Sequence, residues 1–167
     1  MNPAIAKSLN VFCVWLDQTP LSQAIQANSW VVPTVQSIHI LAIAMVAASA
    51  LMIDLRLIGV FGADQPLKTV SARFLPFVWW PLLILFITGA IMIIGEPPRS
   101  LKNPAFQLKM LLLIGALIVT GIFQIMLRTS PAFAGASRSG AGVTIAVVSM
   151  LLWTSIIFAG RWIAYYS

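Results

Sequence analysis

Four long apolar stretches dominate the pattern of hydrophobic and polar positions along this chain. They run from about Trp30 to Ile58, Phe74 to Ile94, Ala105 to Leu127 and Val143 to Tyr166, and polar loops separate them. About 20 helical residues cross a hydrocarbon core of roughly 30 Å, and only helices and closed barrels satisfy backbone polar groups there. The pattern therefore predicts an all-α integral membrane protein, with an up-down bundle of four transmembrane helices in residues 30–167.

The first 29 residues have a different pattern, with apolar positions on one side of a helix. Within residues 3–18 these positions are Ile5, Leu9, Phe12 and Leu16. Thr19 and Pro20 then have the sequence of a helix cap and a first helical position, so a second short helix should extend to Asn28. Both segments are too short and too polar to span a bilayer. We expect residues 1–29 to form amphipathic helices that lie in the membrane interface.

Composition supports this class and excludes others. Hydrophobic residues make up 60% of the chain and charged residues only 8%, whereas a soluble domain has about 25% charged residues. The net charge of +6 arises mainly at the span ends, where cations meet anionic headgroups, so nucleic acid is not an expected partner. Walker, GxGxxG and zinc-ligand spacings are missing from the sequence. The expected partners are the lipid bilayer and other membrane subunits or a second copy of the chain.

The basic residues give only a weak indication of orientation. With four spans both termini lie on one face, which we call side A; its loops and tails carry Lys7, Arg99 and Lys102. The opposite face, side B, carries Arg56, Lys68, Arg73, Arg128 and Arg138. The positive-inside rule places side B in the cytoplasm and the termini outside. Counting Lys109 and Arg161 with side A gives five basic residues on each face, so the orientation remains open.

His39, the single histidine, lies within the first apolar stretch. It is roughly 13 Å along its helix from the side-A end, at 1.5 Å per residue, and Lys109 and Arg161 are each about 7 Å from the side-A ends of their helices. Gln36 precedes His39 by one turn. Ionisable groups within a membrane cost roughly 2.5–3.5 kcal/mol each, so they usually face the bundle interior. We therefore expect His39, Lys109, Arg161 and Gln36 to form one cofactor-binding site.

The chemistry of this cluster suits two ligands. No acid lies at the same depth, and Glu96 is in a loop, so an anionic ligand such as heme b would supply propionates for the cations and an iron for His39. A quinone carbonyl accepting a hydrogen bond from His39 or Lys109 fits almost as well. A second axial ligand could be Met110, Met150, Lys109 or a group from a second copy.

Two simpler interpretations account for the same residues. Lys109 and Arg161 could extend to the interface and keep their charges in water. His39 could form a hydrogen bond between helices, worth about 1–2 kcal/mol. On side B, one acid occurs with three arginines, and we expect a structural ion-pair network there, formed by Asp54, Arg56, Arg73 and Arg128.

The chain resembles the uncharacterised small four-span membrane proteins of bacteria. The resemblance is carried by His39-Ile-Leu-Ala, Asp54-Leu-Arg56-Leu-Ile-Gly59, Asn103-Pro-Ala-Phe106-Gln-Leu-Lys109 and Gly160-Arg-Trp-Ile-Ala-Tyr165. More distantly the chain is similar to the membrane domain of CopD-type copper-resistance proteins and to HemJ-type protoporphyrinogen oxidases. The HemJ resemblance implies a heme ligand at His39 and an essential lysine at Lys109. It also implies the bacterial inner membrane as the location.

The sequence therefore predicts a protein that binds heme b or a quinone and serves electron transfer, as a subunit of a larger redox complex. A non-catalytic accessory subunit is the alternative, and a HemJ-like porphyrinogen oxidase ranks third. Ala44 and Ala48 have the small-xxx-small spacing that lets a partner helix approach closely. This pair is the expected contact of the first span with another subunit.

Overall fold

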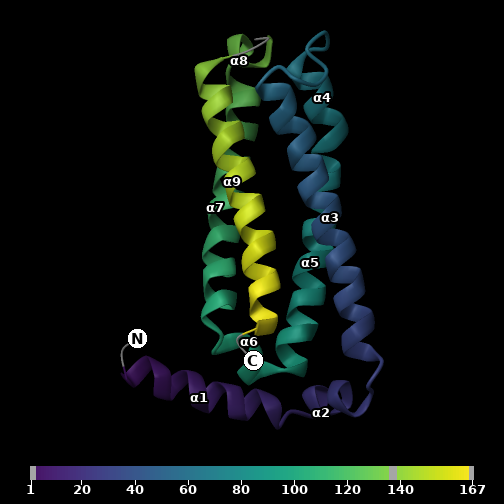
Figure 1. Cartoon of the computed structure of the whole chain (residues 1–167), viewed down its shortest axis with the longest axis vertical. Helices are drawn as coiled ribbons and strands as arrows, with labels where there is room; N and C mark the ends of the chain where they lie inside the picture. Colours follow the sequence, from purple (N-terminus) through teal and green to yellow (C-terminus); the bar gives the residue numbers. More distant parts are fainter. Residues whose placement is uncertain (1–2, 136–138, 166–167) are drawn as a thin grey trace.

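The computed structural model of the protein describes residues 3–135 and 139–165, and all regular structure among them is helical (Figure 1). The long helices are α3 (Val31–Leu57), α5 (Pro76–Gly95), α7 (Pro104–Thr129) and α9 (Gly140–Trp162). By length and composition each can cross a membrane, with α5 extended by α4 into one span from Leu67 to Gly95. The predicted all-α class with four transmembrane helices is confirmed. The long helices begin and end within four residues of the predicted positions.

Two short helices precede the spans and lie across the side-A end of the bundle (Figure 1). They are α1 (Pro3–Asp17) and α2 (Pro20–Ala27). The Thr19 hydroxyl oxygen accepts a hydrogen bond from the Ser22 N–H at 3.3 Å, and Pro20 occupies the first turn, as predicted. One detail differs: Phe12 is 48% exposed, whereas Cys13 is fully buried. The Cys13 thiol faces the Pro97 carbonyl at 3.9 Å, so α1 packs through Cys13.

Three segments expected to be loops contain short helices. They are α4 (Leu67–Phe74), α6 (Pro97–Leu101) and α8 (Pro131–Gly135), and a 3₁₀ turn, Ile163–Tyr165, follows α9. In α6 and α8 a proline starts the helix, where its missing N–H is harmless and its fixed φ favours the helical conformation. Pro66 precedes α4 in an extended conformation. The expectation of loops was wrong because these short polar segments also contain prolines at positions where a helix can begin.

The long helices pack mainly as pairs, α3 with α5 and α7 with α9, and α3 also packs against α9. Burial on α3 is uneven along its length: its buried residues are Ala42, Val46, Ser49, Ala50, Ile53, Asp54, Arg56 and Leu57. No residue from 31 to 41 is buried. We call residues 42–57 of α3, with the neighbours that cover them, the packed half. Residues 31–41, with the neighbours that they contact, are the open half.

Glycine permits the closest approach in the packed half. A Cβ at Gly142 of α9 would lie 3.2 Å from a methyl group of Leu57, so α3 and α9 are as close there as side chains allow. Across all four spans, at most 33% of the most apolar window is buried within the chain. Most of the apolar surface is therefore free to contact lipid.

Candidate functional site

His39 lies in the open half, at the contact between α3 and α5. Its Nδ1 atom is 2.7 Å from Oγ1 of Thr88 on α5. The ring also lies beside Gly89 of α5, where a Cβ would be 3.6 Å from Cε1 of His39, an ordinary contact. The imidazole is half-buried and held by a partner from another span. A helix-to-helix hydrogen bond, one of the two simpler interpretations of this histidine, is thus present.

The hydrogen bonds of Thr88 determine which ring nitrogen of a neutral His39 carries the proton. The Thr88 hydroxyl donates to the Ile84 carbonyl at 2.7 Å, and a carbonyl oxygen can only accept. Having one proton, Thr88 Oγ1 can meet His39 only as an acceptor, so Nδ1 must carry the hydrogen. Nε2 of the neutral ring is then an unprotonated lone pair. This is the arrangement in which a histidine ligates a metal, with its other nitrogen held by a hydrogen bond.

Lys109 enters the same region from α7. Its side chain passes over Gly160 of α9, with Nζ, Cε and Cδ at 3.6–3.8 Å from the Cβ position of that glycine. Lys109 is only partly exposed, and it runs along a neighbouring span. Lys109 is therefore placed against α9 and His39 against α5, and a common site for the two side chains stays a prediction.

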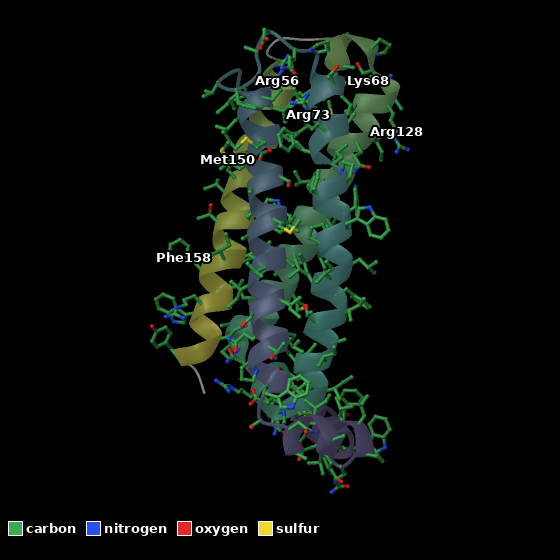
Figure 2. The ribbon with its side chains drawn as sticks, turned by 90° about the vertical axis from the view of Figure 1, so that its right-hand side faces the viewer. Arg56, Lys68, Arg73, Arg128, Met150 and Phe158 are labelled. Carbon is green, nitrogen blue, oxygen red and sulfur yellow. The ribbon has the colours of Figure 1, made fainter. Side chains whose placement is uncertain are left out.

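The other two predicted members, Gln36 and Arg161, are both exposed. Arg161 belongs to the last turn of α9, where it can reach the headgroups, and the predicted cavity shared with His39 stays a prediction. Of the candidate axial methionines, Met150 lies toward side B (Figure 2). It is roughly 15 Å along α9 from Gly160, at 1.5 Å per residue, and so is far from the depth of Lys109.

Two depressions stand out in the described part of the chain, and neither of these two is lined by His39. One is an open depression of about 540 Å³ at the side-A end, between α2 and the turn that contains Glu96. The other is a small cavity of about 20 Å³ beside Asp54 in the packed half. Among residues 3–135 and 139–165, no three His, Cys, Asp or Glu side chains could hold a metal ion together. His39 is therefore not part of such a three-ligand cluster, and a second axial ligand stays open.

The basic residues of side B gather at that end of the bundle, as Figure 2 shows for Arg56, Lys68, Arg73 and Arg128. They do not form the expected network with Asp54. Arg56 donates from Nε and Nη2 to the Gln65 carbonyl, at 3.0 and 2.6 Å, and Arg73 and Arg128 are exposed. In the described residues the one ion pair is Arg99–Glu96 at 3.1 Å, on side A. Positions 54 and 56 point to different sides of a helix, which explains the error.

Two polar residues that matter here were not singled out from the sequence. Thr88 fixes the imidazole of His39, and Ser149 of α9 lines the cavity beside Asp54. Thr88 is the single hydroxyl residue of α5 and Ser149 is one of four in α9, which is a weak signal because such hydroxyls commonly bond to their own helix. Only the pairing between spans gives them a role.

Comparison with known proteins gives one match. A protein-family model, described as DUF6644, a family of unknown function, matches residues 12–166. Comparison with curated proteins and with solved structures gives no match.

Proposed function

The chain belongs to the DUF6644 family, and we propose that it binds heme b through His39 and serves electron transfer within a larger membrane complex. The observation that carries the proposal is the hydrogen-bond chain from His39 to Thr88 to the Ile84 carbonyl. That chain leaves Nε2 of the neutral imidazole as a lone pair at a fixed orientation. Iron in a porphyrin requires such a lone pair from an axial histidine.

The donor set and its surroundings fit this group. Lys109 supplies a cation near His39 for a propionate, and no described carboxylate competes for it in the open half, since Glu96 pairs with Arg99. No residue from 31 to 41 of α3 is buried, so a flat ligand against this face would displace lipid rather than protein. Heme, when bound, supplies one-electron redox chemistry. The chain's own part is to orient the imidazole through Thr88 and to hold a negative group with Lys109.

Quinol binding in the same place is the second candidate, and the orientation of His39 favours one direction of it. With Nδ1 committed to Thr88, neutral His39 can accept a hydrogen bond at Nε2 from a quinol hydroxyl but cannot donate one there. Lys109 would then donate a hydrogen bond to a carbonyl oxygen of the oxidised form, the quinone. A quinol would therefore lose its proton toward His39.

The assembly and its place in the cell complete the proposal. Ala44 and Ala48 are exposed on α3, so inward packing leaves this small-residue pair free for another helix. Such a pair suits either a second copy or a different subunit of a redox complex. The bacterial inner membrane, with side B in the cytoplasm, is the proposed location. An accessory subunit without a cofactor would use the same contacts.

The test is the absorption spectrum of protein purified in detergent from cells grown with excess heme precursor. Wild type should show a Soret band and a reduced α-band, and both should vanish in His39→Ala. Gln36→Ala is the matched control, because Gln36 lies one turn away, is exposed, and should leave the bands intact. Lys109→Met should keep the bands and weaken heme binding.

A folded but colourless wild type would end the heme proposal. Organic extraction of the same sample would then decide between the alternatives. Co-purified quinone that is lost in His39→Ala supports the quinol site. The absence of any bound quinone supports the accessory subunit.

A further inference from the structure

Asp54 lies in the packed half with its carboxyl directed at the small cavity beside it. The residue is 3% exposed, and its Oδ2 atom has no hydrogen-bond partner among the described residues. The cavity of about 20 Å³ is lined by Asp54, Thr120 and Ser149, with apolar side chains completing its wall. Burying a carboxylate oxygen away from water without a hydrogen-bond donor costs free energy, so this oxygen requires a proton or another bonding partner.

No cation among the described residues supplies that ligand. Arg56, on the same helix, directs Nε and Nη2 to the Gln65 carbonyl. Arg73, at the end of α4, and Arg128, at the end of α7, are exposed. In α9 the ionisable residue is Arg161, in the last turn at the side-A end. The cavity lining contains no ionisable side chain besides Asp54.

The hydroxyl groups around the cavity suit a neutral carboxyl better than a charged one. The Thr120 hydroxyl donates to the Ala116 carbonyl at 2.8 Å, so its oxygen can only accept within the cavity. No hydroxyl donor of the lining reaches Oδ2, so an ionised carboxylate would lack a protein donor there, whereas a protonated Asp54 could donate from Oδ2 to a water beside Thr120. Ser149 of α9 lines the same cavity.

The size of the cavity limits what else it holds. A cavity of about 10–15 Å³ accommodates one water molecule, and this one offers about 20 Å³. One water there would contact both the Asp54 carboxyl and Thr120. The oxygen atoms that line the cavity are too few to replace the hydration shell of a metal cation.

We propose that Asp54, Thr120 and Ser149 form a proton-binding site with one bound water, buried between α3, α7 and α9. In the binding step a hydronium ion from the side-B aqueous phase gives its proton to a carboxylate oxygen of Asp54. One O–H bond breaks in the hydronium, one forms on the carboxyl, a water molecule is released, and no electrons are transferred. This site is separate from that of His39 and stands whether or not a cofactor binds there.

Infrared difference spectroscopy as a function of pH tests the proposal, because the chain has only four carboxylic side chains, Asp17, Asp54, Asp64 and Glu96. In reconstituted wild type, lowering the pH should produce the C=O stretch of a protonated carboxyl in an apolar site, and the band should shift in D₂O. Asp54→Asn should remove it. The matched control Asp64→Asn changes an exposed aspartate of a loop and should keep it. Thr120→Val should move the band without abolishing it.

Isotope labelling keeps the test decisive if Asp54→Asn fails to fold. Aspartate labelled with ¹³C at the side-chain carboxyl shifts the band only if it arises from an aspartate, and Asp17 and Asp64 are exposed. The proposal is overturned if no labelled band of a buried carboxyl titrates. It is also overturned if sodium at constant pH changes the band as protons do, because the site would then bind a metal cation.

Discussion

The packed half of α3 buries side chains against other helices, whereas the open half leaves its side chains unburied. From Ala42 onward the helix is covered by α5 and α9, and its small residues allow close contact. From Val31 to Leu41 no side chain is buried, although six of these eleven residues are apolar. In water such a difference would be unstable, but lipid covers apolar side chains as well as protein does. A membrane helix can therefore leave half its length free for a ligand.

The largest expected effect on stability comes from replacing a leucine by alanine in the packed half, compared with the same substitution in the open half. Leu57 is 4% exposed in the packed half, and Leu41 is 66% exposed in the open half. Leu57→Ala should lower the free energy of unfolding by roughly 2–3 kcal/mol, near the low end for buried leucine, because the lost contacts are with protein but transfer is to lipid. Leu41→Ala should change it by less than about 0.5 kcal/mol. Reversible unfolding in mixed micelles measures both, and equal losses would contradict the distinction.

The orientation of His39 should depend on Thr88. Thr88→Val keeps the shape of the residue but removes the acceptor for Nδ1. We expect heme affinity to fall by roughly 10–100-fold, as for other groups that orient a metal-ligating histidine. Heme titration of the purified protein measures this. Thr144→Val is the control, because the exposed Thr144 bonds only to its own helix. Unchanged affinity in Thr88→Val would remove the orienting role.

Two glycines distinguish the halves by the space around them. A Cβ at Gly142 would meet Ser139 Oγ at 3.0 Å and Leu57 Cδ2 at 3.2 Å. Gly142→Ala should therefore destabilise the protein by about 1–2 kcal/mol through forced separation of α3 and α9. At Gly89 the nearest atom would be 3.6 Å away, an ordinary contact. Gly89→Ala should leave stability unchanged or raise it, because alanine favours a helix. The melting temperatures of the two variants give the comparison.

The smallest expected effect concerns how the side-A end is closed. There the fully buried Ser22 of α2 donates to the Ile94 carbonyl at 2.7 Å. Ser22→Ala should lower the free energy of unfolding by about 1 kcal/mol. Ser37→Ala, which removes an exposed hydroxyl bonded within its own helix, should be neutral. If both variants behave alike in the same unfolding assay, α2 is not held by this bond.

The positions of the long helices could be predicted from the sequence because each span is a long apolar stretch bounded by polar segments. The sequence predicts less about pairing, since lipid-facing and protein-facing positions are both apolar and the 3.6-residue pattern is faint. The prediction that His39 and Lys109 share a site rests on depth alone, as both are counted from the side-A end. Depth does not specify direction around a helix, and Arg161, at a similar depth, is exposed. Asp54 failed because nearness to arginines in the sequence does not mean contact.

The pairing of the spans also has a consequence for biosynthesis. Neighbours in the sequence pair first: α3 meets α5, and α7 meets α9, whereas the contact of α3 with α9 joins the first span to the last. A nascent chain that has inserted only α3 to α5 already contains both partners of the His39–Thr88 bond. Asp54 must wait for α9 to deliver Ser149. His39 and Asp54, both on α3, therefore acquire their surroundings at different stages of insertion, His39 with the second span and Asp54 with the last.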